Sequence, residues 1–293
     1  MYTIKQAAHR TGVSIPVLRA WQRRYGIVSP QRTAAGYRLY SDDDIARLSG
    51  MRRLVADGWS ASAAAAFVAA QPGDAVAAAD ASTADPAALV ERFTVAAAAM
   101  DGAALEAVLD AMGSAGSFEQ VAERYLMPGL VGIGDAWARG TLDVAAEHAA
   151  SHAVLRRLSA AFEAAGRAMP DARPVLVGLP PGAHHEFGAL AFAVALRRAG
   201  VPVTYLGADL PTADWLEAVT RTNARAAVIA VPTYADRAAA DEVAAALRAM
   251  SRELIVATGG AHAEGGGIGL GVVTLPNGLA TAASELARAV RTG

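Results

Sequence analysis

The pattern of apolar and polar positions changes along the chain and predicts a helical middle part. Apolar residues recur at helical spacing and are interrupted only by short breaks of Gly and Asp. The segments with this spacing are 87–99, 102–112, 117–138 and 143–165. Helical segments of this length joined by short breaks predict an antiparallel four-helix bundle.

A different pattern follows in residues 172–293, where short β-rich apolar runs alternate with amphipathic stretches. The predicted strands are Val175–Leu179, Val203–Leu206, Ala227–Val231, Leu254–Thr258 and Val272–Leu275. The predicted helices between and after them are 186–199, 212–222, 235–250 and 279–291. This repetition of strand and helix predicts a doubly wound, Rossmann-like parallel sheet.

The N-terminal part begins with signals for two short helices. Thr3-Ile4-Lys5-Gln6 has the pattern of a capping box, so the first helix is expected to begin at Thr3 and to end at Gly12. Ser14 is expected to cap a second helix that runs to about Tyr25. Two short helices joined by a turn that contains Gly predict a helix-turn-helix, and a short β-ribbon is expected over residues 29–40.

A stretch without large apolar residues separates the N-terminal part from the helical one. Residues 71–86 are rich in Ala, Asp, Pro and Ser, which predicts a linker that lets the N-terminal part reorient. The fold class is therefore multidomain, α and α/β. The expected division is residues 1–70 for the N-terminal domain, 71–86 for the linker, 87–168 for the bundle and 172–293 for the sheet domain.

Charge separates the N-terminal domain from the rest of the chain. Residues 1–60 hold ten Lys and Arg against four Asp and Glu, whereas the remaining residues hold 16 against 24. A basic N-terminal domain on an acidic body indicates nucleic acid as its partner, although a solvated basic surface without function is the alternative. Arg19, Arg23 and Arg24 lie on the predicted second helix, where they can reach phosphates and base edges in a major groove.

Other classes are excluded by composition. The chain has no cysteine, which excludes disulfides, thiolate metal sites and cysteine nucleophiles. No apolar run approaches the roughly 20 residues of a membrane span, and the N-terminus has no signal-peptide character. A cytoplasmic protein without a membrane partner is therefore expected.

At this point a resemblance becomes specific. Tyr2-Thr3-Ile4, Trp21-Gln22-Arg23-Arg24-Tyr25-Gly26 and Gly36-Tyr37-Arg38-Leu39-Tyr40 resemble the winged-helix domain of the MerR family of transcription regulators. The resemblance implies a dimer on double-stranded operator DNA, with Arg32, Tyr37 and Arg38 as wing contacts. The alternative is a helix-turn-helix used for contacts with proteins.

A second resemblance concerns the loop Pro180–Gly188, which follows a predicted strand and leads into a helix. An open α/β sheet binds ligands in such loops, outside the carboxyl ends of its strands. The spacing His185-x-x-Gly188 resembles the His-x-x-Gly of cobalamin-binding domains. It implies that His185 is the lower axial ligand of the cobalt and that Gly188, with Thr233, Gly259 and Gly260, lines the nucleotide tail of cobalamin. A lone surface histidine is the alternative.

A third resemblance lies in the helical part, in the spacing Trp137-x9-Glu147-His148. It is similar to the helical domain that caps the upper face of cobalamin in B12-dependent photoreceptors of the CarH/LitR type. It implies that Trp137 packs over the adenosyl group, that Glu147 and His148 hydrogen-bond around it, and that Val144 of the same stretch joins the cofactor site. A buried Trp with a surface Glu-His pair is the alternative.

Two residues depart from these patterns. Ala183 occupies the position two before the ligand histidine, where the family usually has an acidic residue. Ala138 follows the capping tryptophan, where the CarH pattern has a histidine that takes the upper cobalt position after illumination. Alanine has no donor atom, so a cobalt held between two histidines cannot form through residue 138.

Together the resemblances imply a light-responsive repressor that depends on adenosylcobalamin and has no enzymatic turnover. It is expected to bind DNA as an oligomer in the dark, as a dimer of dimers, and to be released when light breaks the cobalt–carbon bond. The alternatives are a light-insensitive regulator that senses cobalamin, a corrinoid-carrying enzyme subunit, and a regulator whose bundle binds no cofactor.

Overall fold

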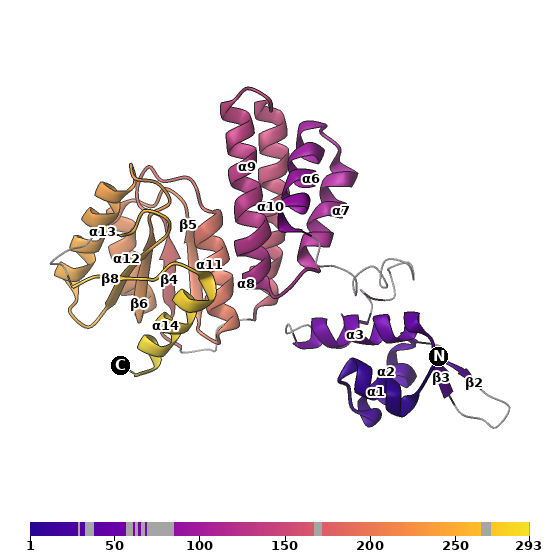
Figure 1. The fold of residues 1–293 in the computed structure, drawn as a ribbon. Helices are drawn as coiled ribbons and strands as arrows, with labels where there is room; N and C mark the ends of the chain where they lie inside the picture. The colour runs from indigo at the N-terminus through magenta and orange to yellow at the C-terminus, as the bar shows by residue number, and fades with distance from the viewer. Residues whose placement is uncertain are drawn as a thin grey trace. The chain divides into compact units, whose positions relative to one another are not determined.

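The computed structural model describes residues 1–28, 30–32, 38–56, 61, 64–65, 68, 85–166, 172–264 and 271–292. The chain divides into two compact units, Met1–Ala88 with Gly113–Ser117, and Leu89–Met112 with Phe118–Gly293. The first unit contains the N-terminal domain, and the second contains most of the helical region together with the sheet domain (Figure 1). The division into four parts inferred from the sequence stays a prediction, and most of the expected linker lies outside the described residues.

The N-terminal domain has the predicted helix-turn-helix and ribbon. Its elements are β1 (Tyr2–Thr3), α1 (Ile4–Thr11), α2 (Ile15–Tyr25), β2 (Gln31–Arg32), β3 (Arg38–Tyr40) and α3 (Asp42–Ala56). The strands form an antiparallel sheet in the order β1-β3-β2. Leu18 and Trp21 of α2 and Tyr40 of β3 are buried in one apolar core.

Local hydrogen bonds explain where two of these helices begin. In the predicted capping box, the Thr3 hydroxyl accepts from the Gln6 N–H at 3.4 Å and the Thr3 N–H donates to Gln6 Oε1 at 2.9 Å. Ser41 accepts in the same way from the N–H of Asp44 at 3.0 Å. Ser14 occupies the N-cap of α2, but its side chain makes no capping hydrogen bond. The start of α2 therefore depends on Pro16 in its first turn, because the fixed φ of proline suits a helix.

The helical region has the four predicted segments, with a break in the third. The elements are α6 (Pro86–Ala98), α7 (Gly102–Gly113), α8 (Phe118–Val121), a π-helical turn (Ala122–Leu126), α9 (Met127–Ala138) and α10 (Val144–Ala164). Pro128 lies in the first turn of α9, two residues after the π-helical turn, and cannot donate a backbone hydrogen bond. The wider turn accommodates the proline without ending the helix. The four-helix bundle predicted from the sequence is thus confirmed as a helical region, interrupted at one point.

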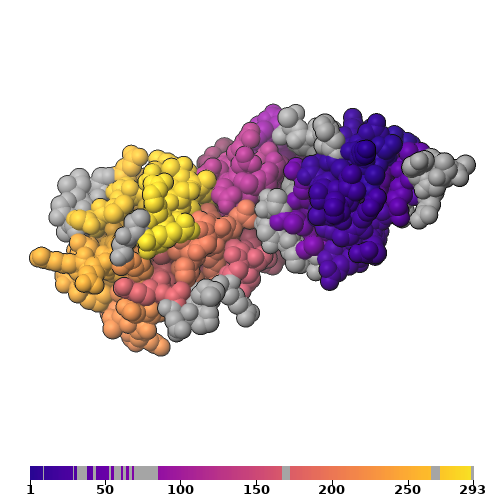
Figure 2. Space-filling model, turned by 90° about the horizontal axis from the view of Figure 1, so that it is seen from below, coloured from indigo at the N-terminus to yellow at the C-terminus, as the bar shows by residue number. Residues whose placement is uncertain are grey.

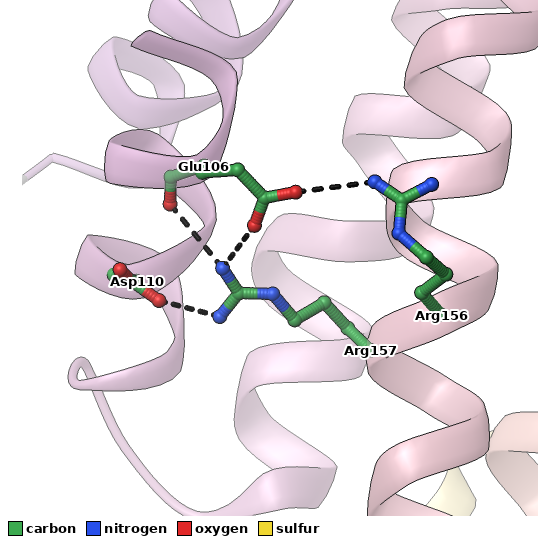
Figure 3. A network of polar contacts seen from close by, with 4 residues as sticks. All are labelled: Glu106, Asp110, Arg156 and Arg157. Carbon is green, nitrogen blue, oxygen red and sulfur yellow. Dashed lines mark hydrogen bonds and ion pairs between the residues drawn. The ribbon is translucent and has the colours of Figure 1, made fainter. Parts of the chain in front are cut away.

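A polar network ties α7 to α10 (Figure 3). The Arg157 guanidinium donates to the carboxylates of Glu106 and Asp110, and Arg156 donates to Glu106 at 3.2 Å. Hydrogen bonding from Arg157 holds the pKa of Glu106 below its ordinary value, because it favours the ionised carboxylate more than burial opposes it. The network therefore joins residues about 50 positions apart and depends on the charge of Glu106.

The sheet domain matches the predicted alternation closely. Its strands are β4 (Val175–Gly178), β5 (Val203–Gly207), β6 (Ala226–Ala230), β7 (Ile255–Gly259) and β8 (Val273–Thr274). Its helices are α11 (Phe187–Arg198), α12 (Thr212–Thr222), α13 (Arg237–Met250) and α14 (Leu279–Thr292). All strand pairs are parallel, in the order β5-β4-β6-β7-β8. The first strand of the domain therefore lies between the second and the third.

Helices cover both faces of this sheet, as a doubly wound fold requires. One buried cluster joins the sheet to α11 and α14, through residues such as Leu196 and Leu286. A second cluster joins the other face to α12 and α13, through residues such as Trp215 and Leu247. In Figure 2 α14, drawn in yellow, lies at the surface of the sheet domain.

The helical region packs on the sheet domain through α10 and α11, which lie side by side. The Arg197 guanidinium lies 3.4 Å from the centre of the Phe162 ring and donates to the Phe162 carbonyl at 2.9 Å. It also donates to the carbonyl of Val203 on β5 at 3.0 Å. Arg197 thus combines a cation–π contact with hydrogen bonds to two carbonyl groups, and it joins the helical region to the sheet domain in a defined geometry.

Within the described residues, no helix is long and apolar enough to cross a membrane.

The Glu106 network generates a prediction about pH. The substitution Glu106→Gln should lower the free energy of unfolding by at most about 1 kcal/mol at neutral pH, because these side chains are partly exposed and screened. The pKa of Glu106 is lowered in the folded state, so its stabilising charge is present above the ordinary glutamate pKa and is lost as the pH falls through the lowered one. Thermal unfolding of both proteins should therefore converge in acid. Glu217→Gln, in an exposed pair within α12, is the control, and an E106Q difference that persists unchanged in acid would contradict the role of the charge.

Candidate functional site

The N-terminal domain presents basic side chains on one face of α2. Leu18 and Trp21 of this helix are buried, whereas Arg19, Arg23 and Arg24 are exposed. Arg19 and Arg23 are four residues apart and therefore lie on the same face of the helix. A second helix of a helix-turn-helix with an exposed basic face is the arrangement that enters a major groove.

The ribbon contributes one basic side chain that the structure describes. Arg38 of β3 is half-buried and pairs in register with Arg32 of β2. The side chain of Arg32 and the whole of Tyr37 lie outside the described residues. Their predicted contacts with DNA therefore stay predictions.

The sheet has its topological switch point at β4, which pairs with β5 on one side and with β6 on the other. Loops that follow strands on either side of such a point turn away from each other and leave a crevice at the carboxyl edge of the sheet. His185 lies in the loop after β4, Thr233 in the loop after β6, and Gly259 and Gly260 at the end of β7. The fold thus brings the predicted residues of the lower cofactor face to one edge.

The segment around His185 leaves its imidazole available for a ligand. His184 and His185 are both exposed, and the structure gives the His185 ring no hydrogen bond to any described residue. The next residue, Glu186, is engaged elsewhere, because its carboxylate accepts from the Tyr205 hydroxyl at 2.8 Å. Burial, together with this hydrogen bond, raises the pKa of Tyr205, so the hydroxyl stays protonated as a donor.

Glycine and threonine shape the rest of this edge. A Cβ on Gly188 would meet no atom within 4 Å, whereas Gly260 has φ +111° and a Cβ there would lie 2.9 Å from the Val231 carbonyl oxygen. The space beside Gly188 leaves room for a ligand. The close packing at Gly260 admits no side chain there and keeps its loop against the backbone of Val231. The buried Thr258 hydroxyl, next to Gly259, has no partner among the described residues. Residues of this kind fit a bulky cofactor with a polar tail.

Thr233 is committed to its own turn. Its N–H donates to Asp236 Oδ2 at 3.0 Å, and its hydroxyl donates to the same oxygen. A hydroxyl that donates within its turn can still accept from a ligand. The predicted role of Thr233 at the nucleotide tail is thus possible only as an acceptor or through its methyl group.

The predicted residues of the upper face lie at one end of the helical region. Gly140 has φ +71° and donates its N–H to the carbonyl of Trp137 at 2.9 Å, which turns the chain between α9 and α10. Asp143 then caps α10 by accepting from the N–H of Ala146 at 2.8 Å. Trp137 is 53% exposed and Val144 is 55% exposed, so this end carries a free apolar surface.

Polar residues adjoin this apolar surface on the first turns of α10. The Glu147 carboxylate lies 2.6 Å from His148 Nδ1 and accepts from the Ser151 hydroxyl at 2.6 Å. Burial acts to raise the pKa of Glu147, but the hydrogen bonds from Ser151 and His148 outweigh it and the pKa is lowered. The ring of His152 stands edge to face with His148, with centroids 6.2 Å apart. An ionised carboxylate therefore orients the His148 ring.

The joint between α10 and α11 relates the two faces. Arg197 links the C-terminal ends of the two helices, which lie side by side. The N-terminal ends of both helices lie away from this joint. The N-terminal end of α11 comes two residues after His185. Phe162 is 18 residues from the start of α10, whereas Arg197 is ten residues from the start of α11. At a rise of ~1.5 Å per residue, the first turns of α10 extend beyond α11 by about 12 Å.

Comparisons with known proteins agree with this geometry. Residues 2–71 match the family described as MerR HTH family regulatory protein. Residues 89–161 and residues 173–266 match two families, each described as a B12 binding domain. The first B12-binding match covers the helical region with Trp137 and His148, and the second covers the sheet domain with His185.

Similar proteins span most of the chain. It is 35% identical over 272 residues to the HTH-type transcriptional repressor CarH of Myxococcus xanthus, which covers 90% of each protein. It is 34% identical over 212 residues to the HTH-type transcriptional repressor CarA of the same organism, which covers 72% of this chain and 69% of CarA. The monomethylamine corrinoid protein of Methanosarcina barkeri is similar in fold alone, with 14% identity, a TM-score of 0.52, and coverage of 69% of this chain and 98% of that protein.

The basic face of α2 generates a prediction about DNA binding. Each Lys or Arg that neutralises a phosphate contributes a slope of roughly −0.9 to the dependence of log affinity on log salt. Arg23→Ala should therefore weaken binding and make the slope shallower by roughly 0.9, measured by fluorescence anisotropy over a salt series. Arg92→Ala, which removes an exposed arginine of α6, should leave the slope unchanged. A slope that is equal in R23A and the parent protein would remove Arg23 from the interface.

Proposed function

Because the chain belongs to the family of CarH-like and CarA-like transcriptional repressors, with MerR-type and B12-binding domains, we propose that it is a light-responsive repressor that uses adenosylcobalamin. In the dark it binds double-stranded operator DNA as a homo-oligomer, a dimer of dimers, and illumination releases it. It carries out no enzymatic turnover. The proposal rests on two residues, one in each B12-binding domain. His185 has no hydrogen bond to the described residues, and the apolar side chain of Trp137 is exposed.

The sheet domain holds the lower face of the cofactor in this proposal. His185 is the lower axial ligand, and its exposed ring, without a hydrogen bond to the described residues, supports that role. The open space in front of Gly188 and the loop held by Gly259 and Gly260 accommodate the nucleotide tail. The unpartnered hydroxyl of Thr258 at the same edge suits a buried polar group of the tail.

The first turns of α10 and the end of α9 hold the upper face. Trp137 and Val144 supply apolar area against the adenosyl group, and Glu147 and His148 supply hydrogen bonds. Adenosylcobalamin supplies a cobalt–carbon bond that visible light breaks. Loss of the upper group would leave the exposed Trp137 without a partner. The dark arrangement of the helical region on the cofactor would then become less stable. A difference of a few kcal/mol between the two states is enough to shift the population.

The position of the helical region then affects DNA binding through assembly. The predicted linker, residues 71–86, tethers each basic N-terminal domain to its oligomer. Tethered domains bind neighbouring operator segments at a high effective concentration, so oligomerisation strengthens weak single contacts. Dissociation of the oligomer on illumination removes that gain and releases the DNA.

Two other functions differ from this one in measurable ways. A light-insensitive regulator that senses cobalamin would use the same lower face, but it would not respond to illumination of the loaded protein. A corrinoid-carrying enzyme subunit would share the fold, as the M. barkeri corrinoid protein does. The MerR-type N-terminal domain and the similarity to repressors over most of the chain favour regulation.

The role of His185 can be tested against its own neighbour. His185→Ala should weaken binding of hydroxocobalamin by at least about 10-fold, because it removes the ligand itself and the loss of a group that only orients a ligand already costs about that much. His184→Ala is a matched control with an equally exposed imidazole one residue away, and it should bind as the parent protein does. Affinity and the absorption spectrum of the bound cofactor measure both effects. If H184A loses binding while H185A keeps it, the ligand is His184, and the proposed role of His185 is wrong.

The lit state provides a separate test of the upper face. Green light should remove the adenosyl group from the loaded protein, but the lit spectrum should differ from that of cobalt held by two histidines, because Ala138 has no donor atom. Ala138→His should produce the two-histidine spectrum, since residue 138 is exposed next to Trp137. Size-exclusion chromatography in the dark and after light follows the oligomer in both proteins. A two-histidine spectrum from the unmodified chain would mean that His148 or His152 supplies the ligand, and H148A and H152A variants would identify which.

A further inference from the structure

His185 lies in a segment whose position is set by its neighbours rather than by regular structure. Residues 179–186 connect β4 to α11 without belonging to a helix or strand. The side chain of His185 is exposed and has no hydrogen bond to the described residues that would orient it. The location of its imidazole therefore depends on what holds the backbone before and after it.

The backbone before His185 is held by Asp209, which follows β5. The Asp209 carboxylate accepts from the N–H of Gly182 at 2.7 Å, and its own N–H donates to the carbonyl of Ala183 at 3.0 Å. Asp209 has φ +53°, a left-handed conformation that Gly, Asn and Asp adopt more readily than other residues. Its carboxylate and its N–H both bind the neighbouring loop, at Gly182 and at Ala183.

The residue after His185 is held by Tyr205, which lies on β5 itself. Its hydroxyl donates to Glu186 Oε2 at 2.8 Å and lies 3.4 Å from the backbone carbonyl oxygen of Glu186. Its ring stands edge to face with Phe162 of α10, with centroids 6.1 Å apart. Tyr205 is therefore fixed by packing and offers Glu186 a rigid donor. The two contacts enclose a short segment, from Gly182 to Glu186, with His185 inside it.

We propose that Asp209 is a positioning residue for His185, and that Tyr205 supports it from the other side. This inference rests on the proposed function, in which His185 is the ligand of cobalt. Each restraint includes a hydrogen bond to a carboxylate, which is stronger than a bond between neutral groups. Asp209 is the stronger restraint because both of its hydrogen bonds are to the backbone of the loop, at Gly182 and at Ala183. Asp209 does not touch the metal; it limits the positions that the imidazole can take.

Substitutions at residue 209 separate the carboxylate from the backbone conformation. Asp209→Asn keeps an acceptor oxygen and tolerates positive φ, so hydroxocobalamin should bind within about twofold of the parent protein. Asp209→Gly also tolerates positive φ but has no acceptor, and it should weaken binding by about 10-fold, at the lower end of the effect of groups that orient metal ligands. Tyr205→Phe removes one hydroxyl and keeps the ring, and it should weaken binding less than D209G does.

The readout that a merely structural role would not produce is a double-mutant cycle with His185→Ala. If Asp209 acts through the histidine, D209G should have no further effect on hydroxocobalamin affinity in the H185A protein. The absorption spectrum of bound cobalamin should also shift in D209G from the histidine-ligated form toward the water-ligated form. Equal losses from D209G in the parent and H185A proteins would overturn the positioning role, as would an unchanged D209G spectrum.

The cycle also separates this inference from the proposed function. Weak binding by H185A together with normal binding by D209G would overturn the role of Asp209 alone. Normal binding by H185A would overturn the proposed ligand and the role of Asp209 with it. If full-length D209G does not fold, as measured by thermal unfolding without cofactor, the spectrum of Y205F decides, and a Y205F spectrum identical to that of the parent protein would overturn the restraint.

Discussion

The contact between Arg197 and Phe162 is the interaction on which the rest of the site depends. It fixes the C-terminal end of α10 to the C-terminal end of α11, and the same guanidinium reaches the carbonyl of Val203 on β5. Burial lowers the pKa of Arg197 but leaves it a cation, because an arginine titrates far above neutral pH. Since α11 starts two residues after His185 and α10 starts seven residues after Trp137, this joint relates the two faces that the proposed function needs.

Patterns of local origin could be predicted from the sequence. The strands and helices of the sheet domain begin and end within about two residues of their predicted bounds, because alternation of β-rich runs and amphipathic stretches reports burial directly. The capping box at Thr3 was likewise readable, since both partners lie within one turn. Ser14 occupies the predicted N-cap of α2, although its side chain makes no capping hydrogen bond. The π-helical turn before Pro128 was missed, because proline signals a disturbance without specifying how the backbone absorbs it.

The order of the strands could not be derived in the same way, although it positions the site. The alternation predicts a parallel sheet, but only the folded chain places β4 between β5 and β6 and so puts the loops of His185 and Thr233 on either side of the switch point. The residues that hold His185 were also missed. Tyr205 and Asp209 lie 19 and 27 residues from their partners, and a tyrosine and an aspartate at the end of a strand carry no spacing signal that separates them from ordinary surface residues.

Ala183 was noted in the sequence as the loss of a carboxylate near the metal ligand, and its surroundings give that loss a physical reading. Ala183 is 1% exposed, so an acidic side chain at that position would have to be buried or would have to displace the loop. Its carbonyl is bound by Asp209, whose carboxylate lies on the preceding residue. A negative charge added at residue 183 would therefore stand beside an existing one, and like charges at such short range raise the free energy of both. The Asp209 carboxylate beside Gly182 comes instead from the residues that follow β5, so its position is set outside the loop that carries His185.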